Sequence, residues 1–190
     1  MRPIAVCAAV WLLAAPSFAS EKGLPPDPRG AQSGRLDTRE RQAVAALARN
    51  AGTAQALGSL ATKRASGGRL GELGQAMAVT NAGLAQQLAQ LAGPENMPLR
   101  ERTDQGELQR LQAMGTDREG FGRELVAWIN AHYPDSIRNI EMLGRDDPRY
   151  AALAEATLPQ LRQQLSVAQE IAQAAIKGPD QQAQQPSMPE

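Results

Sequence analysis

The chain has 190 residues, one histidine and equal numbers of basic and acidic residues (20 each), so its formal net charge at pH 7 is zero. A near-neutral chain without basic clusters lacks the electrostatic footprint for nucleic acid or for anionic lipid. Only 3% of the residues are aromatic, and Ala, Leu, Gln, Arg and Glu, which favour helices, are abundant. The composition therefore predicts a helical protein that does not bind nucleic acid.

The first 19 residues have the layout of a secretory signal peptide. Arg2 supplies a positive charge, residues 4–15 form an apolar run, and small residues stand at Ser17 and Ala19. The run is shorter than the ~20 residues that a membrane span needs. We therefore expect cleavage after Ala19, export to the periplasm (with secretion as the second choice) and no transmembrane segment in the mature chain. The alternative is an uncleaved anchor or a buried helix.

Cleavage would remove Cys7, the only cysteine, together with Arg2, leaving 19 basic and 20 acidic residues. A mature chain without cysteine cannot form a disulfide, a thiolate metal site or a thiol nucleophile. About 170 residues remain, enough for one domain with its own core. Its stability must then come from packing.

The first half of the mature chain predicts a pair of helices. Residues 20–36, rich in Pro and Gly without an apolar period, are expected to be a disordered lead-in. Asp37 and Glu40 form a capping-box pattern that opens a helix to about residue 65. A second helix follows over residues 69–92, and the many glycines inside both helices predict that they approach closely as an antiparallel pair.

The second half predicts a short accessory helix and two long ones. The accessory helix covers residues 104–114. A capping-box pattern at residues 116–119 opens a long helix that ends at Gly144, with a kink expected at Pro134. Asp147 and Pro148 then open the last helix.

The last helix runs to residue 176, with a bend expected at Pro159, and the Gln- and Pro-rich residues 177–190 are expected to be a disordered tail. Each long helix carries an apolar stripe at helical spacing. Burying four such stripes predicts an all-α protein, an antiparallel four-helix bundle over residues 37–176 with one short accessory helix.

Three stretches carry a family likeness: GTAQALGSLA at residues 52–61, LGQAM at residues 73–77 and TLPQL at residues 157–161. They resemble segments of the first, second and last helices of a bacterial envelope family described as domain of unknown function 4142, which is similar to ferritin-like bundles. The likeness covers roughly residues 38–174. It implies a ferritin-like four-helix fold and a role in the bacterial envelope or in stress.

Members of that family carry a glutamate in the first helix, Asp-His pairs in the second and third helices, and a histidine in the last. By analogy with ferritin-like proteins, these side chains would bind metal in the core. The resemblance places most of these positions on neutral residues of this chain: Gln55, Thr80 with Asn81, Ala131 beside His132, and Gln164. Only His132 keeps the family's residue type.

The chemistry of these residues argues against a metal centre. A di-iron bundle uses Glu-x-x-His pairs, which this sequence lacks, and amides bind transition metals poorly. We therefore predict no metal and no cofactor. The residues that share the core positions would instead form a buried polar network that stabilises only if each member finds a partner: Gln55, Thr80, Asn81, His132 and Gln164.

The sequence contains no nucleophile elbow, phosphate loop or dinucleotide fingerprint. Trp128 and Tyr133 are candidates for stacking on a ligand, although core packing is the preferred interpretation of both. The predicted function is that of a non-enzymatic envelope or stress-associated binding or structural protein. The alternative is a metal-binding or redox-protective ferritin-like protein with a degenerate site. A protein partner or self-association stays open.

Overall fold

The computed structural model describes residues 36–65, 67–93, 99, 103–115 and 117–177. These residues form helices and no strand, which confirms the predicted all-α class. In chain order the helices are α1 (Thr38–Arg64), α2 (Arg69–Ala92), α3 (Gln105–Ala113), α4 (Arg118–Asp146), the one-turn 3₁₀ helix η2 (Pro148–Tyr150) and α5 (Ala151–Lys177). The predicted signal peptide, most of the lead-in and the tail after residue 177 lie outside the described residues.

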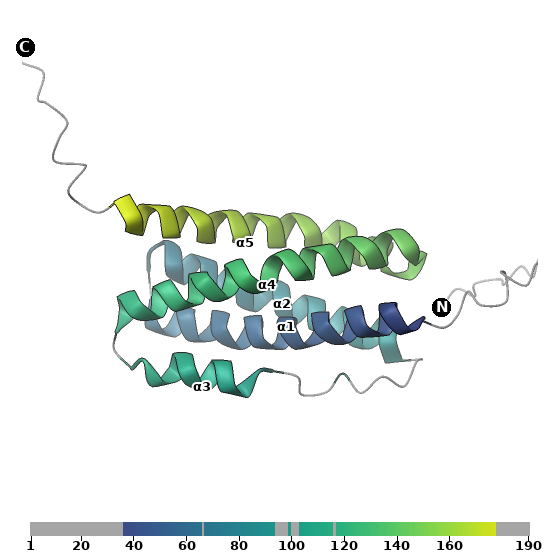
Figure 1. Ribbon diagram of the computed structural model, residues 1–190, viewed down its shortest axis with the longest axis horizontal. Helices are drawn as coiled ribbons and strands as arrows, with labels where there is room; N and C mark the ends of the chain where they lie inside the picture. The colour runs from purple at the N-terminus through teal and green to yellow at the C-terminus, as the bar shows by residue number, and fades with distance from the viewer. Residues whose placement is uncertain (1–35, 66, 94–98, 100–102, 116, 178–190) are drawn as a thin grey trace, which may run out of the picture. The chain divides into compact units, whose positions relative to one another are not determined.

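The four long helices form an antiparallel bundle, as predicted. Helix α1 packs against α2 and α4, and α5 packs against α4 and α2 (Figure 1). Neighbouring long helices run in opposite directions, whereas α2 and α4 run in the same direction (Figure 1). The connection between α2 and α4 therefore spans the length of the bundle, and α3, the accessory helix, lies along it against the outside of α1 (Figure 1).

Local capping fixes where the helices begin. The predicted capping box is confirmed, since the Glu40 amide donates to Asp37 at 2.7 Å and the Asp37 amide donates to Glu40 at 2.6 Å. The cap of α4 is Asp117, which accepts from the Gly120 amide at 2.8 Å. The box predicted from residue 116 is therefore wrong by one position, because the backbone of Asp117 is still non-helical (ψ 89°).

Neither proline interior to a long helix ends it. Helix α4 continues through Pro134 to Asp146, two residues beyond the predicted end, and α5 continues through Pro159. Proline removes one backbone donor from the helix. Buried side chains on both sides of Pro134, such as Tyr133 and Ile137, hold the two halves of α4 on the same core.

The corner between α4 and α5 depends on Asp147. Its carboxylate accepts from the Arg149 amide at 2.9 Å and pairs with the Arg149 guanidinium at 2.6 Å. These hydrogen bonds from Arg149 hold the pKa of Asp147 below its usual value. The last helix was expected to start directly at Asp147 and Pro148, but a 3₁₀ turn comes first and buries Tyr150.

The core runs the length of the bundle and draws on all four long helices. Its largest fully buried side chains are Tyr133, Tyr150, Phe121, Leu47, Leu57, Met77, Leu88, Leu111, Leu125, Ile129, Ile140 and Leu143. Leu36, expected in the disordered lead-in, is only 2% exposed and belongs to this core. Leu36 directly precedes the helix cap Asp37, and burying its apolar side chain lowers the free energy relative to leaving it in water. No helix among the described ranges is long and apolar enough to cross a membrane.

Helices α1 and α2 approach so closely that glycine is required at their contact. A Cβ atom added to Gly58 would lie 2.5 Å from the Gly74 carbonyl oxygen and 2.7 Å from the Ala78 amide. A Cβ atom added to Gly74 would lie 2.6 Å from the Cβ atom of Ala61. The predicted close approach is therefore confirmed at this pair, whereas Gly83 faces open space and takes no part in it.

The Gly58→Ala substitution is expected to lower the free energy of unfolding by about 1–3 kcal/mol, because the new methyl group would overlap the backbone of α2. Gly83→Ala is the matched control. It adds the same atoms in the interior of α2 without a clash, so it should raise stability by up to about 1 kcal/mol. Urea unfolding measures the change in the free energy of unfolding for each variant. Equal changes in Gly58→Ala and Gly83→Ala would contradict the close contact of α1 and α2 at Gly58.

Candidate functional site: a buried polar network

The hydroxyl of Tyr133 joins three helices inside the core. Tyr133 lies on α4 and is 2% exposed. Its hydroxyl donates to Oε1 of Gln164 on α5 at 2.9 Å and accepts from Nδ2 of Asn81 on α2 at 3.1 Å. Both amides are buried as well, with exposed fractions of 4% and 3%. One hydroxyl thus fixes α2, α4 and α5 relative to one another.

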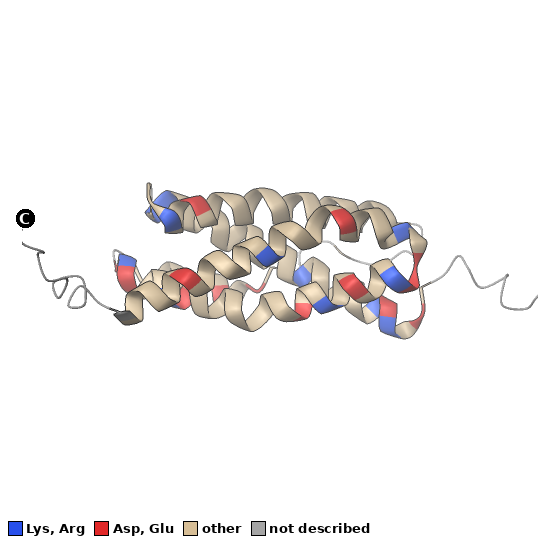
Figure 2. Ribbon diagram, turned by 90° about the horizontal axis from the view of Figure 1, so that it is seen from above, with Lys and Arg blue, Asp and Glu red and all other residues tan. Residues whose placement is uncertain are grey.

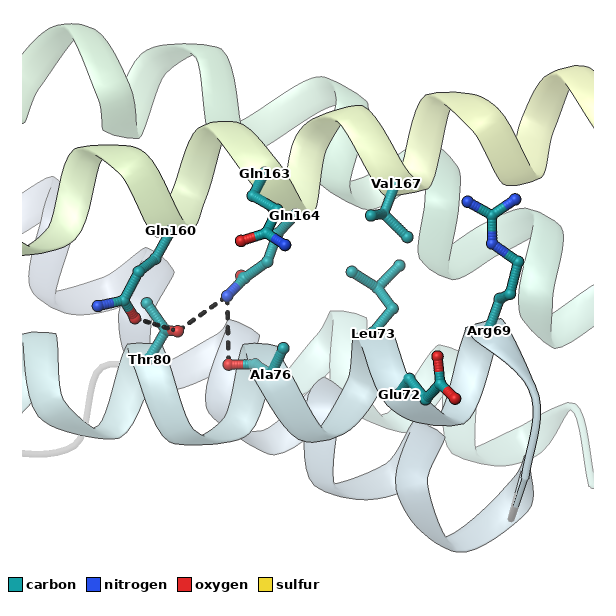
Figure 3. Close-up of a pocket in the computed structure, with 9 residues that line it drawn as sticks. All are labelled: Arg69, Glu72, Leu73, Ala76, Thr80, Gln160, Gln163, Gln164 and Val167. Atoms are coloured by element: carbon teal, nitrogen blue, oxygen red, sulfur yellow. Dashed lines mark hydrogen bonds between the residues drawn. The ribbon is translucent and has the colours of Figure 1, made fainter.

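From Gln164 the network continues to the surface between α2 and α5. Nε2 of Gln164 donates to Oγ1 of Thr80 at 2.9 Å and to the carbonyl oxygen of Ala76 at 3.2 Å. The Thr80 hydroxyl in turn donates to Oε1 of Gln160 at 2.8 Å. Figure 3 shows these bonds in a row, from the buried Gln164 to the exposed Gln160.

Every hydrogen-bond donor at the centre of the network is in use. The two protons of the Gln164 amide serve Thr80 and Ala76, and those of the Asn81 amide serve Tyr133 and the Met77 carbonyl, the latter at 2.8 Å. The Tyr133 hydroxyl both donates and accepts. A buried network stabilises a fold when its members are satisfied in this way.

The network is also electrically neutral. Burial raises the pKa of the Tyr133 hydroxyl far above its usual value, and the hydrogen bond from Asn81 only partly opposes that shift. The other members are amides and a threonine hydroxyl, which do not titrate in the physiological range. The network therefore provides neither a charged ligand nor a group that exchanges protons near neutral pH.

The outer end of the network opens into a groove of about 370 Å³ between α2 and α5 (Figure 3). Thr80, Gln160 and Gln164 lie at one end of it, and Arg69 lies at the other, where it forms an ion pair with Glu170 across the two helices (Figure 3). Leu73 and Val167 face each other between the two ends (Figure 3). The groove is therefore polar at both ends and apolar in the middle.

The structure brings together three of the five residues predicted to form the network, Thr80, Asn81 and Gln164, and separates the other two from them. Gln55 is exposed on α1, and His132 is only half-buried on α4. One residue along a helix turns the side chain by about 100°. Tyr133, not His132, therefore occupies the core position that faces Asn81 and Gln164.

The aromatic residues of α4 pack on one another. The rings of Trp128 and His132 lie 4.7 Å apart at 33°, and Trp128 meets Tyr133 edge to face at 6.2 Å. Trp128 is 5% exposed. Because both proposed stacking residues, Trp128 and Tyr133, are covered by the core, neither presents an open ring face for a ligand to stack on.

Sequence reasoning missed two polar links that hold the helices in place. Nδ2 of Asn50 on α1 donates to Oγ of Ser136 on α4 at 3.1 Å. Oγ1 of Thr53 accepts from the amide of Asp104, the cap of α3, at 2.8 Å. The partners lie 86 and 51 positions apart in the sequence, so no local pattern indicates them.

The residues at the network do not fit a di-metal centre. Such a centre needs several carboxylate or imidazole ligands converging in the bundle core. Here Asn81 and Gln164 are amides whose protons are already donated, and the neutral Tyr133 lies between them. The described residues contain no group of three or more His, Cys, Asp or Glu side chains able to hold a metal ion.

Comparison with known families shows a match to the family described as "Domain of unknown function (DUF4142)", over residues 25–171. The match covers all of α1 to α4 and most of α5. No curated protein and no solved structure matches the chain.

The Tyr133→Phe substitution removes only the hydroxyl oxygen. It leaves Nδ2 of Asn81 and Oε1 of Gln164 short of one partner each, so the free energy of unfolding should fall by about 1–3 kcal/mol. Gln163→Ala is the control, since Gln163 lines the same groove but is exposed, and its effect should stay within about 0.5 kcal/mol. If urea unfolding gave the same free energy of unfolding for Tyr133→Phe as for the parent protein, the Tyr133 hydroxyl would contribute nothing to stability.

Proposed function

Because the chain belongs to the family of domain of unknown function DUF4142, we propose that it is an exported, non-enzymatic binding or structural protein of the bacterial envelope. Export is supported by the signal-peptide layout of residues 1–19. The envelope role is supported by the family likeness, which is an argument by analogy. These proposals go beyond the family match, which names no activity.

The observation that carries the non-enzymatic role is the saturated network around Tyr133. Acid–base catalysis needs a group whose pKa lies near the working pH and which can reach a substrate. The network consists of groups that stay neutral, and their protons are donated within the protein. The chemistry of the network is suited to aligning helices. A ligand or partner would therefore bind at the surface of the bundle.

A metal-binding or redox-protective role is the second candidate. Two observations favour it: ferritin-like bundles also use a single long crossover connection, as between α2 and α4, and His132 is half-buried and therefore accessible. The ligand set weakens it, because amides stand where a bundle metal site needs charged ligands.

Metal loading separates the two candidates. The purified chain is incubated with Fe²⁺, Mn²⁺ or Zn²⁺, desalted and analysed for bound metal beside His132→Ala. We expect well under one equivalent of metal in both proteins, because one imidazole without carboxylate partners is a weak site. Stoichiometric metal in the parent that is lost in His132→Ala would overturn the non-metal proposal.

Export is tested by the N-terminus of the mature protein. In a Gram-negative host we expect the chain in the periplasmic fraction, with Ser20 as its first residue by mass spectrometry, because Ser17 and Ala19 fit the cleavage pattern. Ala19→Asp should block processing and leave the longer chain at the membrane. A parent protein that keeps Met1 and stays in the cytoplasm would contradict export.

A further inference from the structure

A second groove, of about 530 Å³, lies where the first half of α4, the end of α5 and the start of α2 meet. Most of its lining is apolar, and it comes from all three helices. These side chains are Leu70, Val126, Ala127, Ile171, Ala172, Ala175 and Ile176. A cavity of this volume falls in the range of sites that take small molecules.

Small side chains keep this groove open. Gly122 lies in its lining, and a Cβ atom there would come within 3.2 Å of Cδ2 of Leu70. Ala127 and Ala172 leave room on either side. Ile176 is 85% exposed, one of the large apolar side chains that the bundle leaves in solvent. The groove therefore holds apolar surface that a ligand would remove from water.

The charged residues of the groove have an excess of positive charge. Arg118 and Arg123 lie along α4, and the single acid, Glu119, is paired with Arg123 at 3.1 Å. In the part of the chain that the structure describes, Arg118 forms no ion pair. Figure 2 shows that elsewhere on the described helices basic and acidic positions are interspersed. An anionic group at the Arg118 end would meet a cation that has no competing partner.

We propose that this groove binds a linear alkyl carboxylate, a free fatty acid, with its tail along the apolar floor and its carboxylate at Arg118 and Arg123. The groove residues of α4 extend from Arg118 to Asn130, 12 positions, or about 18 Å of helix. That length suits an extended alkyl chain. The lining combines an apolar floor with a few polar side chains, Arg118, Glu119, Arg123 and Asn130, the usual make-up of a small-ligand site.

A second copy of the chain fits this surface less well. A stable interface buries about 800 Å² on each partner and avoids charge at its centre. Here Arg118, Glu119 and Arg123 line the groove itself, so a flat partner surface would have to desolvate all three. A fatty acid brings only its carboxylate to the exposed Arg118 and Arg123 and covers the apolar floor with its tail.

This inference rests on the proposed binding role but uses none of the residues of the Tyr133 network. Its failure would therefore leave the metal and network experiments unaffected. Conversely, stoichiometric metal that is lost in His132→Ala would overturn the proposed function and leave the question of fatty acid binding to the titrations below.

The first experiment is a calorimetric titration of the purified full chain with octanoate, decanoate and dodecanoate, each below its micelle concentration. We expect binding with one site per chain, and a dissociation constant that falls about fourfold for each added methylene, the equivalent of ~0.8 kcal/mol per buried CH₂. The gain should stop once the groove is full. A dodecyl trimethylammonium ion should bind more weakly than dodecanoate, because the arginines would repel its head.

Matched variants locate the site. Ala127→Leu fills the groove and should abolish binding, whereas Ala131→Leu, on an exposed position of α4 outside the groove, should not change it. Arg118→Gln should weaken binding of dodecanoate about two- to fivefold, the scale of an exposed ion pair, and Arg138→Gln should leave it unchanged. Circular dichroism checks that each variant is folded.

Three outcomes would overturn the inference. The first is no binding of any of the three carboxylates. The second is binding that does not depend on chain length or that Ala127→Leu leaves as strong as in the parent, which would place it elsewhere, for example on the apolar residues 4–15. The third is a concentration-dependent dimer by light scattering that Ala127→Leu abolishes and dodecanoate does not disturb, which would assign the groove to a second copy.

Discussion

The Tyr133 hydroxyl can be satisfied only when α2, α4 and α5 stand in one relative position, and the arrangement of the bundle depends on that requirement. A shift of one residue along α4 would move the ring by 1.5 Å and turn it by about 100°, which would break both of its bonds. Each buried polar group left without a partner costs about 1–3 kcal/mol, against a total stability of about 5–15 kcal/mol for a domain. Apolar contacts alone do not distinguish such positions as sharply, because leucine and alanine stripes pack acceptably in several registers.

Helix α1 is positioned by a different kind of contact. Gly58 and Gly74 let the backbones of α1 and α2 touch, so this pair is held by close packing over its length. A polar bond from Asn50 to Ser136 then links α1 to α4. The α1–α2 pair is thus one unit, and the Tyr133 network attaches its α2 side to the α4–α5 pair. Close backbone contact sets the distance within the first pair, and hydrogen bonding sets the register between the two pairs.

Local features could be predicted from the sequence, and positions across the core could not. Caps such as Asp37 and stripes at helical spacing depend on neighbours within a few residues, so the helices and the bundle follow from them. The core face of α4 was ambiguous, since His132 and Tyr133 lie three and four positions after the buried Ile129 and either spacing is helical. The family likeness drew attention to His132, but a likeness between short segments does not determine which way a side chain points. Gln55 was misplaced for the same reason, because it follows the buried Ala54 and yet faces solvent.

The hydrogen bonds of the Tyr133 network also shape the surface where α4 begins and α5 ends. Tyr133 and Gln164 fix the pairing of these antiparallel helices, so residues seven positions back on α4 stand opposite residues seven positions on along α5. That relation places Val126 beside Ile171, both of which line the apolar groove. The centre of the network has no spare donor to offer a ligand directly. It acts instead through geometry, because the spacing of the two groove walls is set by the register that the buried tyrosine imposes.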